Sequence, residues 1–384
     1  MSLNKSECNK VKSSFIRRVK IISFGLMHEL INDISVSRLA TGVQFDGEDI
    51  TKYILSYKDR IKLEVIDYGA IITALHLPDR DGLVENVCIG LDKPEEYLID
   101  NPYFGAIVGR YANRIKDGRF MLNDEYYQLE RNNGPHHLHG GLNGFSHKKW
   151  KSEIMPYENG AAVKFQLFSP HLDENYPGNL NVELVYAVNK QSEWIVEINA
   201  VSDRDTIFNM TQHSYFNLSG NFDGDIFDHK FYIDADHYLP VDATMIPTGT
   251  LQKVDNSPFD LRTERSIADL LQAKSDPQLN LASGFDHCFT LNRNDVDHIS
   301  ASAYHKDSGR RMTLKTNLPG MQFYTANTLS DFKSNSSKAY ADHSAFCFET
   351  QHFPDAPNQS HFPSAVIKAN EAIAYKTVFG FSVE

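Results

Sequence analysis

One imidazole lies in a stretch of hydroxyls, amides and aromatic rings that contains no charged residue. The stretch is residues 209–220 (NMTQHSYFNLSG), and the imidazole is His213. Ser214 can donate and accept hydrogen bonds, Tyr215 offers a flat apolar face, and Gly220 lets the chain turn away. This mixture predicts a polar pocket for a neutral ligand with many hydroxyl groups, such as a sugar. The alternative is a structural histidine in a strand, because histidine is often partly buried.

A carboxylate with surroundings suited to proton transfer lies near the C-terminus. Glu349 follows the apolar run 345–348 within FCFETQHFP (residues 346–354). We therefore expect it to be partly removed from water, which raises the pKa of a carboxylate toward the range that proton transfer needs. The alternative is a glutamate at a strand end that pairs with an arginine.

Two further segments carry groups that could hold hydroxyls. In GRYANRI (residues 109–115), the planar guanidinium of Arg114 beside the amide of Asn113 can hold neighbouring hydroxyls in a fixed geometry. Solvated arginines at a strand end are the alternative, since arginine is usually exposed. Asp286 lies between Phe285 and His287, where it could bind a hydroxyl or only cap a turn.

Three histidines in residues 132–145 (NNGPHHLHGGLNGF) suggest a metal site, but their spacing does not support one. A cupin-type H-x-H motif needs a carboxylate three or four residues on, and residues 140–145 contain no acid. The spacings of zinc sites do not match either. We therefore predict no metal, a hydrogen-bonding role for His139, and positions on an exposed loop for His136 and His137.

These groups need a scaffold, and the sequence predicts one made of strands. Turn clusters of Gly, Asn and Asp separate segments in which apolar and polar residues alternate, namely 59–66, 162–168, 181–188 and 194–200. Helical signals are limited to 94–98 and 263–274. We predict an all-β protein, a large antiparallel β-sandwich with few short helices, whose long loops carry the chemistry.

The domain organisation follows from where this alternation begins. Residues 46–384 contain no linker, repeat or low-complexity tract, so we predict a single domain there. Residues 1–45 combine mixed charge with irregular apolar spacing, and we expect an extension outside the main fold, with Met27 as an alternative start.

Composition excludes several classes of partner. The 384 residues carry a net charge of −12, which repels phosphate backbones and anionic lipids, so nucleic acid is not expected as a partner. No apolar stretch approaches the roughly 20 residues that span a bilayer, and residues 17–27 match a secretory signal poorly, so we expect a cytoplasmic protein without a membrane role. The four scattered cysteines predict reduced thiols, and neither a G-x-G-x-x-G motif nor a P-loop points to a nucleotide cofactor.

Taken together, six sequence blocks resemble the galactose mutarotase (aldose 1-epimerase) family over roughly residues 50–384. The blocks are GRYANRI, LHGG followed by GF and Trp150, QHSYFNLSG, FDH, PGMQFYTAN and FETQHFPDAPNQSHFP. The resemblance implies a large β-supersandwich and an isomerase that interconverts the anomers of free aldohexoses such as galactose and glucose, as a monomer or homodimer, without cofactor or metal. Residues 1–45 inherit nothing from it.

The resemblance also implies roles for individual residues. His213 would be the general acid and Glu349 the general base. The substrate would be bound by a set of polar and aromatic side chains, namely Asn113, Arg114, His139, Ser214, Tyr215, Asp286 and Gln322. The sequence leaves open which aldose is preferred and whether His139 or His213 protonates the ring oxygen.

Three other functions stay open from the residues alone. A glycoside hydrolase would use Asp286 and Glu349 as its carboxylate pair. A hexose-6-phosphate epimerase would need basic residues for the phosphate beyond Arg110 and Arg114. A non-catalytic sugar-binding module would keep Arg114 and Asp286 but would not need His213 together with Glu349.

Overall fold

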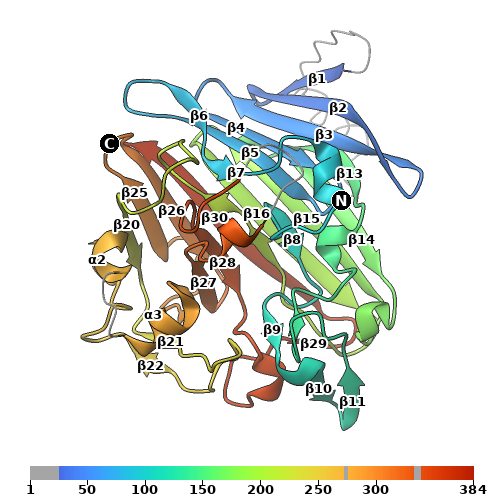
Figure 1. Ribbon diagram of the computed structural model, residues 1–384. Coiled ribbons are helices and arrows are strands. Elements are labelled where there is room, and N and C mark those ends of the chain that lie inside the picture. Colours follow the sequence, from blue (N-terminus) through green and yellow to red (C-terminus); the bar gives the residue numbers. More distant parts are fainter. Residues whose placement is uncertain (1–25, 272–275, 333–338) are drawn as a thin grey trace, which may run out of the picture.

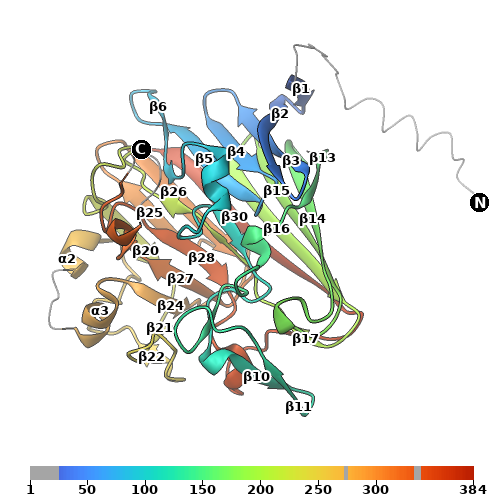
Figure 2. The same ribbon diagram turned by 45° about the vertical axis from the view of Figure 1, so that its right-hand side comes forward.

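Two large antiparallel sheets pack face to face, and a third sheet lies beside them (Figures 1 and 2). The computed structural model describes residues 26–271, 276–332 and 339–384. The six-stranded sheet has the order β1-β2-β3-β4-β5-β6, with β1 (Leu26–Ile31), β2 (Ile34–Phe45), β3 (Glu48–Tyr57), β4 (Ile61–Ile66), β5 (Ile71–Pro78) and β6 (Val84–Asn86). It is drawn in blue at the top of Figure 1.

The nine-stranded sheet is the largest element of the fold. Its order is β13 (Lys151–Tyr157), β14 (Gly160–Ser169), β15 (Leu180–Asn189), β16 (Glu193–Ser202), β30 (Ala372–Val383), β26 (Arg310–Thr316), β25 (Ala301–His305), β20 (His229–Ile233) and β23 (Arg265–Ser266). The five-stranded sheet has the order β22 (Gln252–Lys253), β21 (His237–Leu239), β24 (Asp286–Thr290), β27 (Gly320–Tyr324) and β28 (Cys347–Gln351).

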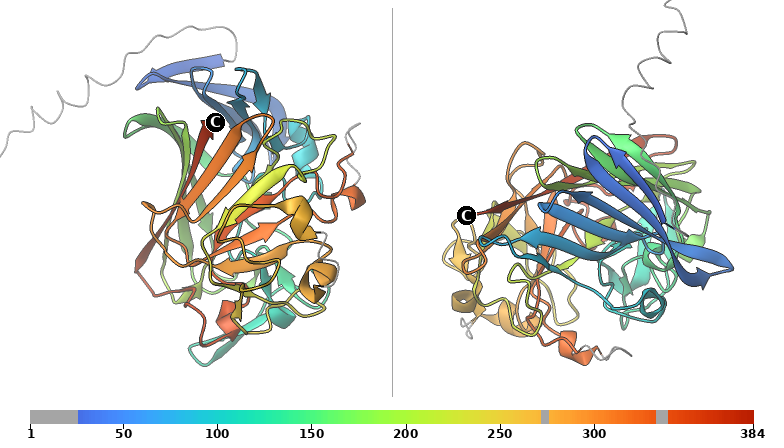
Figure 3. Two further views of the ribbon diagram at one scale, coloured as in Figure 1. Left: turned by 90° about the vertical axis from the view of Figure 1, so that its left-hand side faces the viewer. Right: turned by 90° about the horizontal axis from the view of Figure 1, so that it is seen from above.

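Short strand pairs and helices fill the space around these sheets. The pairs are β7 (Cys88–Ile89) with β19 (Tyr215–Phe216), β8 (Ala106–Val108) with β18 (Thr211–His213), β9 (Arg114–Ile115) with β12 (His137–Leu138), β10 (Arg119–Leu122) with β11 (Glu125–Gln128), and β17 (Thr206–Ile207) with β29 (Val366–Ile367). The helices are α2 (Ile267–Leu271) and α3 (Pro277–Ala282), and the 3₁₀ turns are η1 (Pro94–Leu98), η2 (Lys116–Gly118), η3 (Phe145–His147), η4 (Asp173–Asn175), η5 (Leu329–Asp331) and η6 (Ala356–Asn358). The helix α2 packs against β20 and β23 at the end of the nine-stranded sheet, and both α-helices lie away from the six-stranded sheet (Figure 3).

The main core forms between the inner faces of the two large sheets, and β15 shows why. Every second residue of β15, including Leu184 and Tyr186, faces this core, while Val185 and Ala187 join a smaller apolar cluster. Such alternation is the geometry of a strand. Burying each large apolar side chain stabilises the fold by about 1.5–3 kcal/mol.

The structure confirms the predicted fold class and the predicted strands. The alternating segments became β4, β14, β15 and β16, and residues 94–98 form η1. The helix expected over 263–274 is shorter, because 265–266 pair as β23 with β20 and only 267–271 are helical; residues 272–275 lie outside the described residues.

One expectation about the N-terminal region needs correction. Residues 26–45 do not lie outside the main fold, because β1 and β2 continue the six-stranded sheet next to β3. Ile31, Ile34 and Val36 are buried in the main core. The irregular apolar pattern of this region reflects the C-terminal half of β2, which extends beyond the residues that pair with β1 and alternates between half-buried and exposed side chains. Residues 1–25 lie outside the described residues.

Within the ranges that the structure describes, no helix combines the length and the apolar character needed to cross a membrane.

Candidate active site

Strands from four parts of the chain bring the predicted residues together at the centre of the molecule. His213 ends β18, which pairs with β8 and packs near β28, the strand of Glu349. Asp286 begins β24, and Arg114 begins β9. These strands surround a cavity of about 390 Å³, which is within the usual range for small-molecule sites.

Seven of the nine predicted residues line this cavity, and two do not. The seven are Asn113, Arg114, His139, His213, Tyr215, Asp286 and Glu349. Ser214 lies between His213 and Tyr215, and successive side chains of an extended chain point to opposite faces, so Ser214 points away from the cavity. Its hydroxyl accepts a hydrogen bond from the Gln212 side chain at 2.7 Å. Gln322 is also held in a side-chain network behind the cavity wall.

His213 and Glu349 form a buried pair. The His213 Nε2 atom lies 3.6 Å from Glu349 Oε2, and the residues are only 5% and 2% exposed. On its other side, His213 Nδ1 lies 3.7 Å from the Sγ atom of Cys347. Among the described residues, Glu349 Oε2 has no hydrogen-bond partner, so it is available to a ligand.

Burial drives the pKa values of the two groups in opposite directions. It raises the pKa of Glu349 well above its usual value; the Asp286 carboxylate adds to this and Arg114 opposes it. Burial lowers the pKa of His213 to about 4. Burial therefore favours a protonated Glu349 beside a neutral His213, so that the pair holds one transferable proton.

His139 has a defined tautomer. Its Nδ1 atom accepts a hydrogen bond from the backbone N–H of Asn113 at 3.1 Å, so the neutral ring carries its proton on Nε2. Burial lowers the pKa of His139 well below its usual value, and His213 and Arg114 add to this effect. His139 is therefore a neutral donor in the cavity wall.

The tautomer of His139 also bears on metal binding. The ligand atoms of His139, His213 and Glu349 lie within 4.8 Å of one another, a spacing that a metal ion could bridge. A histidine that binds a metal normally donates its other ring N–H to an acceptor. In His139 the other nitrogen is itself an acceptor, so Nε2 keeps its proton and offers no lone pair. The donor set does not fit a metal.

The other two histidines of this segment are not on an exposed loop, as predicted, but buried. His136 Nδ1 accepts the backbone N–H of Asp117 at 3.0 Å, and His137 lies between the Glu130 carbonyl and the Tyr176 hydroxyl. They are 4% and 0% exposed because β12 pairs with β9 and draws the segment into the fold. Both have structural partners outside the cavity.

Asp286 and Arg114 form another part of the cavity wall. Arg114 Nη1 lies 3.9 Å from Asp286 Oδ2, and its Nε atom donates to the Asn133 side chain at 3.2 Å. Gln322 donates to Asp286 Oδ1 at 2.6 Å and accepts from Gln351 at 3.3 Å. Gln322 therefore orients the carboxylate of Asp286, which leaves Oδ2 toward Arg114 and the cavity.

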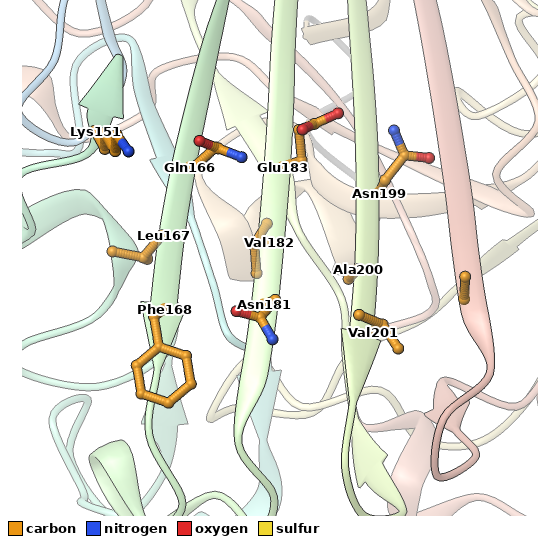
Figure 4. Close-up of a pocket in the computed structure, with 11 residues that line it drawn as sticks. Lys151, Gln166, Leu167, Phe168, Asn181, Val182, Glu183, Asn199, Ala200 and Val201 are labelled. Carbon is orange, nitrogen blue, oxygen red and sulfur yellow. The ribbon is translucent and has the colours of Figure 1, made fainter.

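A larger groove exists elsewhere on the surface. It measures about 560 Å³ and lies on the outer face of β14, β15, β16 and β30, where Phe168 and the amides of Gln166 and Asn181 are exposed (Figure 4). None of the predicted site residues belongs to it. The smaller cavity is the candidate site because it alone, of the two, contains a buried acid/base pair.

Comparison with known proteins decides the family. The aldose 1-epimerase family model matches residues 51–380. This chain is 40% identical over 351 residues to galactose mutarotase of Bos taurus, covering 91% of this chain and 99% of that protein. It is 31% identical over 342 residues to aldose 1-epimerase of Escherichia coli (strain K12), covering 88% and 97%. The chain belongs to the aldose 1-epimerase family.

A solved structure supports the same assignment for the fold. Galactose 1-epimerase from Lactobacillus acidophilus NCFM superimposes with a TM-score of 0.80 at 28% identity, covering 91% of this chain and 98% of that one. Members of the aldose 1-epimerase family are isomerases, and this chain has the β-rich architecture that the resemblance implied.

Sequence reasoning missed several residues of this family member's cavity. Tyr103 packs against both imidazoles of the cavity, with its ring centroid 4.7 Å from that of His139 and 6.2 Å from that of His213. Tyr324 also lines the cavity. Tyr324 could have been found, because it lies two residues after Gln322 in a strand. Tyr103 sits in a loop before β8, where no periodicity marks it.

Proposed function

We propose that the protein interconverts the α and β anomers of free aldohexoses, such as galactose and glucose, by acid/base-catalysed opening and closing of the sugar ring. The observation that carries this proposal is the buried pair of His213 and Glu349, 3.6 Å apart at the edge of a cavity lined with hydrogen-bonding groups. Membership of the aldose 1-epimerase family supports the same reaction.

The reaction needs two proton transfers on the same substrate. Glu349, as the carboxylate, takes the proton of the anomeric hydroxyl, and the protonated His213 gives its proton to the ring oxygen as the bond from C1 to that oxygen breaks. The open-chain aldehyde then rotates about its bond from C1 to C2. Closure on the other face of the carbonyl reverses both transfers and restores the protonation of the pair.

The preference of the buried pair for a protonated Glu349 sets the first step. Moving its proton across the 3.6 Å to His213 Nε2 produces the carboxylate and imidazolium that the reaction uses. Hydroxyls bound at Oε2, which has no partner among the described residues, stabilise the carboxylate. Substrate binding therefore favours the reactive protonation state of the pair.

The remaining cavity residues hold the sugar. Asp286 and Arg114 bind hydroxyls from one side, Asn113 and Tyr215 complete the wall, and the Nε2–H group of His139 donates a further hydrogen bond. Gln322 acts through Asp286. We assign His213, and not His139, as the acid because its Nε2 atom lies 3.6 Å from Glu349 Oε2, where the two groups can exchange a proton.

The cellular setting is part of the same proposal. The net charge of −12 and the free, buried thiols of Cys88, Cys288 and Cys347 are consistent with a reducing cytoplasm. We infer a monomer or homodimer that acts on a small-molecule aldose and has no nucleic acid or membrane partner.

Polarimetry tests the proposal directly. Fresh α-galactose should reach its equilibrium rotation faster with the protein than without it, and prolonged EDTA treatment should leave the rate unchanged. Binding of galactose without acceleration would instead indicate a sugar-binding module. Release of galactose from a galactoside would indicate a hydrolase. A loss of rate in EDTA that a divalent metal restores would contradict the metal-free mechanism.

A further inference from the structure

The cavity is lined by an unusual share of residues with a left-handed backbone. A positive φ disfavours residues other than glycine, and such conformations gather where function requires them. The residues of this kind in the lining are Tyr103, Asn113, His139, Met245 and Ser283. Asn, Ser and His tolerate this conformation comparatively well. Met245, at φ 64°, has a flexible apolar side chain and gains no such local support.

The turn that carries Met245 is held firmly in place. The Asp242 carboxylate accepts hydrogen bonds from the backbone N–H groups of Thr244 and Ile246, and the N–H of Met245 donates to the Asp242 carbonyl at 2.9 Å. Val241, the residue before Asp242, is also held: the side chain of Gln278 from α3 accepts a hydrogen bond from its N–H and donates one to its carbonyl. The position of Met245 is therefore fixed by the fold.

Core packing does not account for a methionine here. Within the described part of the chain, Met245 belongs to none of the apolar clusters, although its neighbour Ile246 is fully buried. Its half-buried side chain lies in the cavity wall, together with Leu281 and Ala282 of α3. Glycine or asparagine would adopt this backbone more readily, so the side chain itself has to compensate for the strain.

We propose that Met245 contacts the substrate and sets affinity for it, by covering the C–H surface of the bound sugar opposite the polar wall. Sugars present apolar C–H groups as well as hydroxyls, and a thioether adapts to irregular apolar shapes. This inference rests on the proposed function, because it takes the ligand of the cavity to be an aldose. Met245 has no role in proton transfer.

This role predicts that removing the Met245 side chain lowers the affinity for galactose without lowering the melting temperature. In Met245→Gly, the apolar contact is lost, so KM for galactose should rise about tenfold, as expected when an apolar group is removed from a pocket. The melting temperature should stay equal or rise, because glycine relieves the left-handed strain. In Met245→Leu, an apolar side chain remains, and KM should stay within about threefold of the wild type.

The experiment measures KM and kcat by polarimetry, the dissociation constant of galactose by calorimetry, and the melting temperature, for the wild type and both variants. An unchanged KM and dissociation constant in Met245→Gly would overturn the inference. So would equal losses of affinity in both variants together with a lower melting temperature, which would show a structural residue. If the wild type binds galactose but does not accelerate mutarotation, the proposed function fails while the dissociation constants still decide the role of Met245. If the wild type does not bind galactose, both are wrong.

Discussion

Replacing the buried carboxyl of Glu349 by an amide should separate catalysis from folding. Glu349→Gln keeps the size of the side chain but cannot accept the anomeric proton. We expect kcat to fall by about 10² to 10⁴, the usual contribution of a positioned base, which corresponds to about 3–5 kcal/mol of transition-state stabilisation. Sugar binding should persist, because Asp286 and Arg114 remain in place.

The same substitution should not lower the free energy of unfolding. Burial raises the folded-state pKa of Glu349 above its unfolded value, so between these two values the folded chain holds a proton that the unfolded chain releases. Glu349 therefore lowers stability as pH rises above about 4.5, by about 1.4 kcal/mol for each unit of its pKa shift. Replacing this titratable carboxyl by an amide should leave the variant at pH 7 as stable as the wild type or more stable.

The pH dependence of kcat assigns the two roles. In Glu349→Gln, only the requirement for a protonated His213 remains, so the acid limb should disappear. In His213→Asn, only the requirement for an ionised Glu349 remains, so the alkaline limb should disappear. Polarimetry across pH and chemical denaturation of each variant provide the measurements.

Two results would refute this reasoning. A Glu349→Gln variant with kcat within about threefold of the wild type would exclude Glu349 as the base, since a base contributes at least about 10². An alkaline limb that persists in His213→Asn but disappears in His139→Asn would transfer the acid role to His139. His139→Asn serves as the matched control because both histidines line the same cavity and both are buried.

Three further predictions test other parts of the structure. Asp286→Ala should raise KM for galactose by about 10- to 100-fold with a smaller change in kcat, since its hydroxyl contacts are present before and during the reaction; steady-state kinetics in which only kcat falls would contradict this. His229 is neutral in the fold, because burial and the neighbouring His305 lower its pKa to about 3, so it lowers the free energy of unfolding as pH falls below 6.5. In His229→Gln, the proton uptake on unfolding, taken from the pH dependence of urea denaturation in acid, should fall by about one proton. An unchanged proton uptake would refute this cause. A chain that begins at residue 26 should keep its activity. A chain that begins at residue 46 lacks β1 and β2, and its melting temperature should be at least about 10 °C lower. Equal melting temperatures of the two chains would mean that these strands do not support the core.

The sequence predicted the parts of the fold that depend on local alternation. The strand β15 was predictable because Leu184 and Tyr186 repeat every second residue, and a strand must place such residues on one face. The strand β2 was not, because its C-terminal half buries little and carries no clear repeat. Its place in the sheet depends on pairing with β3, which is a property of two segments together.

The same limit applies to the histidines. A histidine in the sequence does not show whether it is exposed, since burial depends on partners that lie elsewhere in the chain. His137 is buried because Tyr176, 39 residues away, comes within 2.6 Å of its ring. His139, two residues on, instead reaches the cavity. The glycines of residues 132–145 predicted that this segment approaches a ligand site, but they could not show that His137 is buried in the fold while His139 lines the cavity.

The role of Gln322 shows what register adds to a family resemblance. Resemblance placed Gln322 among the residues that bind the sugar, but β27 lies between β24 and β28, with Gln322 directly opposite Glu349 on one side and Cys288 on the other. Asp286 is then its diagonal neighbour, within reach of a long side chain. The 2.6 Å hydrogen bond to Asp286 follows from this register. One glutamine thus connects the strand of the proposed base to the carboxylate that we propose binds the substrate, so a substitution at either position should affect the other.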